Sequence, residues 1–275
     1  MTTELLRALA ILAEPPAAHT SAIAAALDLP GRPDPAEYTD LFVLQLWPYA
    51  SIYVGGEGKV GGEARDRVAG FWRALRLTPP AEPDHLAALL GLYATVAETE
   101  ANENDAARRQ LRRRSRQALL WEHLLCWLPP YLTKMDEIGT PFYRAWGELL
   151  RETLNAEAEE LGAPERLPLH LREAPALTEP DEILAPVRSG MVFVRNDLKR
   201  AANSLGLGLR QGERSYVLKS LLAQDPTAML GWLGEEAARW VHLHRAMPDQ
   251  LQPVRDFWVS RAEISAEMLG AQIPA

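Results

Sequence analysis

The sequence lacks most of what would tie it to a membrane, an oxidising compartment or a cysteine-bound metal. Its single cysteine, Cys126, excludes an internal disulfide and any zinc or iron–sulfur site built from several cysteines. A reducing cytoplasm suits such a chain. No apolar run approaches the ~18 residues needed to span a bilayer. The N-terminal apolar stretch is interrupted by Arg7 and has no basic residue ahead of it. It therefore indicates a short amphipathic helix and not a secretory signal, and we expect a cytoplasmic protein.

Signatures of catalysis and of nucleotide binding are also lacking. Residues Gly56–Gly61 match the dinucleotide pattern G-x-G-x-x-G literally, but no strand precedes them. Val60 stands where a P-loop needs serine or threonine, so the sequence favours a flexible loop. His242 and His244 are two residues apart and point to different sides of a helix, so they cannot chelate one ion. We expect no catalytic residue, no metal site and no cofactor, and predict that the chain is not an enzyme.

The composition is that of a globular, acidic chain. Hydrophobic residues make up 47% and charged residues 24% of the sequence, which provides for a sizeable core and argues against global disorder. The formal net charge of −8 argues against nucleic acid as the main partner and favours a cationic one. The length suits one large domain, or one domain with a smaller extension.

Apolar residues recur at helical spacing almost throughout, and alternating, strand-like segments are scarce. Asp34 is predicted to cap a helix, Pro35 fits the first helical position, and Glu37 would complete a capping box. Thr140 and Asp225 each precede a proline and repeat the pattern. We predict an all-α fold, with helices from Asp34 to about Trp47 and near residues 63–76, 84–100, 104–128, 140–161, 191–205, 212–224, 226–247 and 253–269.

Residues 163–190 have a different character, because their prolines make a continuous helix implausible. These prolines are Pro164, Pro168, Pro175, Pro180 and Pro186. The sequence predicts a helical domain over residues 1–162, a proline-rich linker or strap over residues 163–190, and a helical C-terminal extension over residues 191–275.

Two features leave open a regulatory or nucleic-acid-binding adaptor as the alternative function. The first is the arginine run of residues 108–116, which lies in a predicted helix. The acidic segments 98–105 and 157–160 could neutralise it, so a solvated or internally paired helix face is favoured. The second is the predicted helical hairpin of residues 198–222, which faintly resembles a helix-turn-helix but lies in a half of the chain without net positive charge.

Five segments, in order along residues 35–160, resemble the TorD/DmsD/NarJ family of chaperones for redox-enzyme maturation. Tyr38–Phe42 matches the family's aromatic-x-x-Leu-Phe element, and Trp47–Tyr53 resembles the turn rich in proline and aromatic residues that follows it. Glu82–Leu86 is close to the family's most recognisable motif. Trp121–Trp127 looks like its His-Leu…Trp helix, and Thr140–Leu149 closely matches its Pro-Phe-Tyr-Arg-Ala-x-Gly-Glu-Leu segment. Five motifs in register are more specific than any one of them.

The resemblance implies a TorD-like helical bundle, here with a C-terminal helical extension. It implies a cytoplasmic chaperone that binds the twin-arginine signal peptide, the apo form, or both, of a molybdopterin-containing oxidoreductase. Such a chaperone assists cofactor insertion before export by the Tat system and needs no cofactor of its own. Relatives exchange helices to form dimers, so a homodimer is one oligomeric state that the resemblance allows.

Carried over position by position, the resemblance implies a peptide-binding site. Aromatic side chains would line a groove for the apolar part of the peptide, and carboxylates would bind its arginines. Ordinary core packing is the competing interpretation for the aromatic residues, and a helix cap is the competing one for Asp84. The implied signal-peptide-binding residues are Tyr38, Leu41, Phe42, Pro48, Tyr49, Glu82, Pro83, Asp84 and His85.

Overall fold

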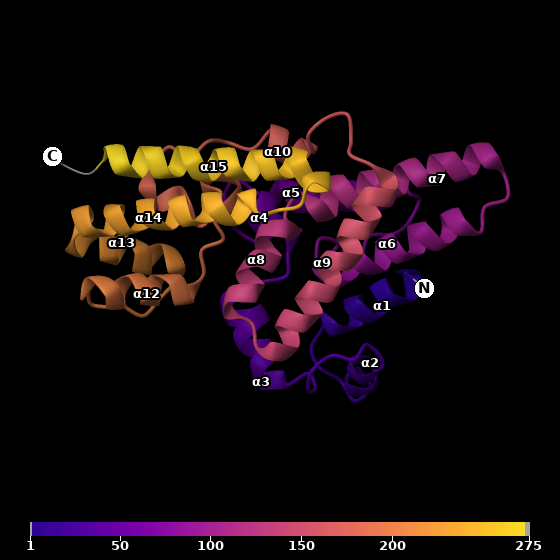
Figure 1. Ribbon diagram of the computed structural model, residues 1–275, viewed down its shortest axis with the longest axis horizontal. Helices are drawn as coiled ribbons and strands as arrows, with labels where there is room; N and C mark the ends of the chain where they lie inside the picture. Colours follow the sequence, from indigo (N-terminus) through magenta and orange to yellow (C-terminus); the bar gives the residue numbers. More distant parts are fainter. Residues whose placement is uncertain (1, 273–275) are drawn as a thin grey trace.

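The computed structural model describes residues 2–272 and shows an all-α fold (Figure 1). Within these residues the chain forms helices and one isolated antiparallel bridge, between Tyr49 and His85, but no strand. This confirms the fold class predicted from the helical spacing of apolar residues. Within the same residues, no helix has the combination of length and apolar character that crossing a membrane requires.

The first part of the chain packs its helices around α6 and α9. α1 lies along α6, and α6 pairs with α7 in a hairpin that projects from the rest of the molecule (Figure 1). The elements of this part are α1 (Thr2–Leu12), α2 (Thr20–Ala26), α3 (Pro35–Tyr38), the π-helix η1 (Thr39–Gln45), α4 (Ala50–Val54), α5 (Gly62–Ala74), α6 (Leu86–Ala101), α7 (Ala106–Ala118), the π-helix η2 (Leu119–Leu125), α8 (Leu128–Ile138) and α9 (Pro141–Leu161).

The caps of α3 and α9 show where local patterns predicted the structure and where they did not. Asp34 accepts hydrogen bonds from the backbone N–H groups of Ala36 (2.8 Å) and Glu37 (3.1 Å), as predicted. The predicted capping box at Glu37 is wrong, and Thr140 makes no side-chain cap on α9. The Thr140 hydroxyl donates to the Glu37 carboxylate at 2.9 Å, so a contact between distant helix starts replaces both local bonds.

Helix α8 was not predicted from the sequence. The predicted helix over residues 104–128 was expected to end before Pro129 and Pro130, whereas these prolines occupy the first turn of α8. Proline is tolerated there because the first backbone N–H groups of a helix have no partner within the helix. The face of α8 that this start positions is buried, including Tyr131 and Met135.

Residues 163–190 form a strap that packs against the helices on both sides of it. It contains α10 (Leu169–Arg172), the 3-10 helix η3 (Pro180–Leu184) and α11 (Pro186–Ser189). Its Ile183 and Val187 are fully buried, and α11 contacts both α4 and α15. The strap ends at Gly190, whose φ is +72° and where an added Cβ would clash with the backbone nitrogen of Ala262. Only glycine fits this turn.

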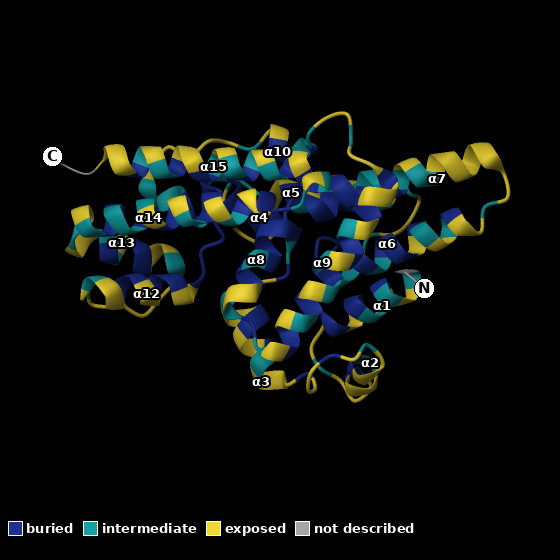
Figure 2. Ribbon diagram, viewed as in Figure 1, coloured by how far each residue is buried: buried dark blue, intermediate teal, exposed yellow. Residues whose placement is uncertain are grey.

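The predicted C-terminal helices are confirmed as α12 (Arg195–Leu205), α13 (Arg214–Gln224), α14 (Pro226–Arg245) and α15 (Gln252–Ala271), with the 3-10 turn η4 (Asp249–Leu251) between the last two. α14 and α15 lie side by side along most of their length (Figure 1). One continuous apolar core runs from Leu6 to Leu269 and therefore includes both parts of the chain. Figure 2 shows this buried interior, with exposed residues along the outer faces of α7 and α15. The proposed domain boundaries stay a prediction.

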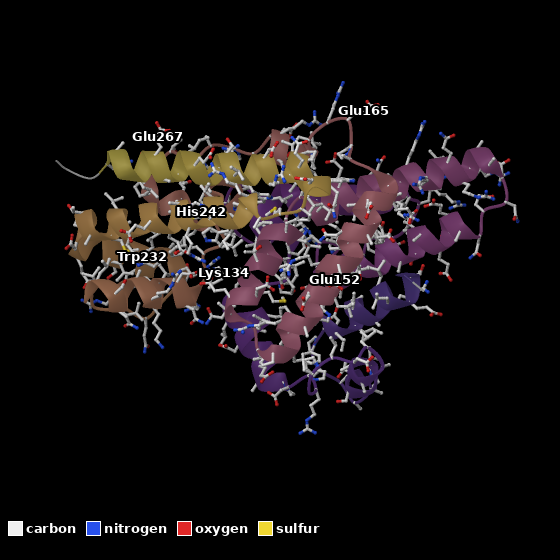
Figure 3. The ribbon with its side chains drawn as sticks, in the orientation of Figure 1. Lys134, Glu152, Glu165, Trp232, His242 and Glu267 are labelled. Carbon is white, nitrogen blue, oxygen red and sulfur yellow. The ribbon has the colours of Figure 1, made fainter. Side chains whose placement is uncertain are left out.

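A buried ionic cluster joins α8 to the C-terminal helices, and Figure 3 shows Lys134 at this junction. The Lys134 ammonium group is fully buried, and its Nζ lies 3.0 Å from the Asp197 carboxylate on α12 and 2.9 Å from Glu137. Arg200 reaches both Asp197 and Glu236 at 3.0 Å. Because each buried charge has opposite charges around it, the desolvation cost of burial is offset by ion pairing.

Candidate functional site

Two of the family-like segments cross where α4 and α6 begin. The Leu86 N–H donates to the Pro48 carbonyl at 2.8 Å, and the Ala50 N–H donates to the Asp84 carbonyl at 3.0 Å. These two bonds form the antiparallel bridge between Tyr49 and His85. Residues 47–51 and 82–86, which lie far apart in the sequence, are thereby brought together in one place.

Asp84 lies inside this crossing. Its side chain is 1% exposed, and Oδ2 accepts a hydrogen bond of 3.1 Å from the Ser51 N–H in the first turn of α4. Within the described residues Oδ1 has no hydrogen-bond partner. The competing interpretation, in which Asp84 caps the following helix, is wrong: His85 caps α6, and the Asp84 carboxylate binds the first turn of α4. The carboxylate therefore fixes how the two segments cross.

His85 has a structural role of the same kind. Its Nδ1 accepts the Ala87 N–H at 3.2 Å, so that nitrogen is unprotonated. The ring packs edge-on against Tyr49 with centroids 5.0 Å apart. Burial lowers the pKa of His85 although Glu14 Oε1 lies 3.6 Å from Nδ1. The imidazole is a neutral member of the crossing.

Tyr49 and Glu82 are the two members of the set that reach solvent. The Tyr49 hydroxyl donates to Glu82 Oε2 at 2.9 Å, and burial together with this bond raises the pKa of Tyr49. Glu82 is exposed, as is Glu14 beside His85. Within residues 2–272 neither carboxylate has a lysine or arginine within ion-pair distance. The surface formed by Tyr49, Glu82 and Glu14, which we call the acidic surface, is therefore available to a cation from outside.

The other predicted aromatic residues belong to the core. Tyr38 and Phe42 are buried, and Phe42 packs edge-on against Tyr143 with centroids 5.1 Å apart. Burial, followed by the negative charges of Glu14 and Glu82, raises the pKa of Tyr38 to about 12. Leu41, Pro48 and Pro83 are buried as well. Core packing is thus what these side chains do in the free protein.

A groove at the turn before α4 has a lining that the sequence did not predict, because none of Tyr38, Phe42 and Tyr49 lines it. It encloses about 510 Å³ between η1, α4, residues 56–61, which we call the glycine-rich loop, the end of the strap and the start of α13. Trp47 lines it and is 44% exposed. The only sequence signal for it was the tryptophan in the proline- and aromatic-rich turn, because its walls come from segments more than 100 residues apart.

The glycine-rich loop forms one wall of this groove and is held against the strap. Gly58 has a φ of +63°, and an added Cβ there would lie 2.7 Å from the Leu184 carbonyl oxygen. The Gly56 carbonyl accepts a hydrogen bond of 2.6 Å from Arg188. The literal G-x-G-x-x-G pattern therefore reflects close packing of a loop onto the strap, without the strand that a dinucleotide site requires.

Three of the six arginines in the run on α7 pair with acidic residues of the protein, as the favoured interpretation expected. Arg116 lies 3.2 Å from Glu100 and 3.5 Å from Glu157. Arg113 pairs with Glu160 at 3.0 Å, and Arg112 pairs with Glu103 at 3.2 Å. A helix face whose charges are satisfied in this way has less to offer a nucleic acid.

Comparison with known proteins finds a family whose model covers these features. Residues 13–133 match the family model described as nitrate reductase delta subunit. The matched segment starts directly after α1 and ends within α8, so it contains the crossing, the acidic surface and one side of the groove. No curated protein matches the chain significantly.

Proposed function

We propose, from the match of residues 13–133 to the nitrate reductase delta subunit family of molybdoenzyme maturation chaperones, that this chain is a cytoplasmic chaperone of that kind with no catalysis of its own. Its client is the catalytic subunit of a molybdopterin-containing oxidoreductase. It binds the twin-arginine signal peptide of that subunit, its apo form, or both, and assists cofactor insertion before Tat export.

The acidic surface is the observation that supports peptide binding most directly. The Tyr49 ring and the Glu82 carboxylate lie together, and Glu14 adds a second carboxylate. Guanidinium groups bind carboxylates through paired, charge-assisted hydrogen bonds and pack on aromatic faces. Such an exposed surface gives modest affinity, which suits a chaperone because its client has to be released.

The buried members of the family-like motif support the same function indirectly. Asp84 and His85 fix the crossing of residues 47–51 and 82–86, and this crossing places Tyr49 beside Glu82. In this proposal Asp84 and His85 act through the position of their neighbours, and Glu82 contacts the arginines.

Fluorescence anisotropy with a labelled twin-arginine signal peptide tests the proposal. Wild type should bind, Glu82→Gln should weaken binding roughly twofold to fivefold, and Glu14→Gln/Glu82→Gln should weaken it about tenfold, since each exposed ion pair contributes a modest amount. Glu267→Gln makes the same charge change at the outer end of α15 (Figure 3) and should bind as wild type does. Absence of binding by wild type, or equal losses in all variants, would contradict the proposed function.

A further inference from the structure

The connection between α12 and α13 runs back alongside the two helices that it joins. Gly208 follows the end of α12, and its N–H donates at 2.7 Å to the side chain of Gln224, the last residue of α13. Gly212 precedes the start of α13, and its carbonyl accepts a hydrogen bond of 3.1 Å from Arg195, the first residue of α12. The two helices therefore start together and end together, which is not the arrangement of a helical hairpin.

The middle of this connection has a backbone that is open to a partner. Leu209, Arg210 and Gln211 are exposed and belong to no helix or turn. Within residues 2–272 their backbone N–H and C=O groups make no hydrogen bond with other backbone groups. The bonds at Gly208 and Gly212 hold the connection at both ends, so these open groups have a fixed place. Exposed, unpaired backbone groups can bond to an incoming extended chain.

The segment that contains this connection is positively charged, although the chain as a whole is acidic. Residues 195–219 hold six Lys and Arg against two Asp and Glu, a net charge of +4 in a chain whose total is −8. The rest of the chain therefore carries −12. One of the two carboxylates, that of Asp197, is buried in the cluster at Lys134 and does not reach the surface.

Three of the six cations lie along the connection. Arg195 and Lys199 are four residues apart on α12 and share a face, and from this face Arg195 reaches Gly212. Arg210 belongs to the connection itself. All three are exposed, and in the described part of the chain none has a carboxylate within ion-pair distance. We call residues 208–212 together with these side chains the basic surface. The other cations, which are paired or hydrogen-bonded inside the protein, are Arg200, Arg214 and Lys219.

We propose that the basic surface is a docking site for an acidic, extended segment of a partner protein. The backbone of that segment bonds to the open backbone groups of the connection, and its carboxylates pair with the three cations. Leu209, which is 48% exposed, and Tyr216, which is 55% exposed and packs over Gly212, add apolar contacts. The site lies outside the family-matched residues 13–133, and the inference goes beyond the proposed function.

A short protein segment fits the basic surface better than a long polyanion or a membrane does. A nucleic acid or an anionic lipid surface carries its charge well beyond the three cations, where the −12 of the rest of the chain repels it. An acidic protein segment confines its charge to a few residues. Its backbone also supplies both the donors and the acceptors that the connection leaves open.

Fluorescence anisotropy with a labelled peptide of about ten alternating glutamates and valines, long enough to cover the connection, tests the inference. The double variant Lys199→Gln/Arg210→Gln should weaken its binding about tenfold, because two exposed ion pairs are lost. Arg114→Gln is the matched control. It makes the same kind of charge change at an exposed position of α7, at the opposite end of the molecule (Figure 1), and should bind within about twofold of wild type.

A second peptide separates backbone pairing from attraction between charges. It has the same sequence, but alternate backbone nitrogens are methylated and cannot donate. It should bind wild type about tenfold more weakly than the parent peptide, because the hydrogen bonds of one edge are lost. Equal binding of the two peptides would overturn the inference, since the backbone of the connection would then have no part in docking.

The remaining outcomes also decide the matter. No binding of the parent peptide by wild type, or a loss in Arg114→Gln equal to that in the double variant, would overturn the inference. Phosphatidylglycerol vesicles and a single-stranded oligonucleotide are measured alongside. If either binds more tightly than the peptide and depends on Lys199 and Arg210, the surface serves another class of partner and the inference is overturned. None of these measurements uses a signal peptide, so their failure leaves the proposed function untouched.

Discussion

The acidic surface and the ionic cluster at Lys134 use the same kinds of charged group in opposite ways. At the cluster, every charge is surrounded by opposite charges from α8, α12 and α14, and the lysine has no contact with solvent. At the acidic surface, Glu14 and Glu82 face solvent with only neutral partners. The first arrangement fastens the C-terminal helices to the rest of the fold. The second leaves interaction capacity for another molecule.

The largest effect should come from breaking the cluster. Lys134→Met leaves Asp197 buried with one cation fewer, and we expect the free energy of unfolding to fall by about 3 kcal/mol. Urea unfolding measures it, with Lys199→Met on the exposed face of α12 as the control. The double variant Lys134→Met/Asp197→Asn should lose less than the sum of its single changes. Strict additivity would show that the pair is not coupled.

A second expected effect comes from protonation inside the C-terminal helices. Burial lowers the pKa of His244 to about 4 from an ordinary value of 6.5. Between these values the unfolded chain takes up a proton that the folded chain does not, so the free energy of unfolding falls as pH falls. From pH 6.5 to 5 this amounts to about 1.5 kcal/mol. His244→Gln should flatten the stability–pH curve; a curve parallel to that of wild type would refute the assignment.

A smaller effect is expected at the crossing. Asp84→Asn should lower the free energy of unfolding by about 1 kcal/mol, because an amide oxygen accepts a weaker hydrogen bond from Ser51 than a carboxylate does. It should also weaken peptide binding, since Tyr49 and Glu82 lose their support. Chemical denaturation and anisotropy on the same preparation check both. Weaker binding with unchanged stability would mean that Asp84 contacts the peptide itself.

The smallest effect on stability should come from the acidic surface. Glu82→Gln keeps an acceptor for the Tyr49 hydroxyl, so the free energy of unfolding should stay within about 0.5 kcal/mol of wild type. Thermal unfolding of Glu82→Gln, compared with that of wild type and of Lys134→Met, measures this change in stability. A loss comparable to that of Lys134→Met would remove the contrast between the two regions, because Glu82 would then be a structural residue too.

The sequence predicted what depends on neighbours along the chain. Helical spacing gave the fold class, and the Asp34 cap and the Asp225 cap, whose carboxylate accepts the Ala228 N–H at 2.9 Å, follow from the residues around them. The pairing of Arg113 and Arg116 with acidic residues on α6 and α9 was expected because the opposite charges stood in helices long enough to reach.

Contacts between distant segments were beyond such patterns. Asp84 has the position of a local cap, yet its carboxylate serves Ser51 because the bridge at Tyr49 brings α4 to it. The sequence indicated that Asp84 caps a helix start, but it did not indicate which helix. The lining of the groove was even harder to predict. Leu44, Val60 and Phe193 are distant in the sequence and are brought together by the packing of the strap against the glycine-rich loop. Leu44 and Phe42 are both apolar residues of the same helix, and the sequence does not reveal that Leu44 is exposed and Phe42 is buried.

The turn at Gly190 makes the end of the strap depend on α15. There the strap lies so close to the backbone of α15 that no side chain would fit between them. The Gly190 carbonyl oxygen lies 2.6 Å from His244 Nε2, and the Ser265 hydroxyl donates to the Ser189 carbonyl at 2.8 Å. Removing α15 would strip the cover from this turn and from the buried residues after it. A variant of this chain without α15 would leave the Ser189 carbonyl without the Ser265 hydroxyl and the Gly190 turn without the helix against which it packs.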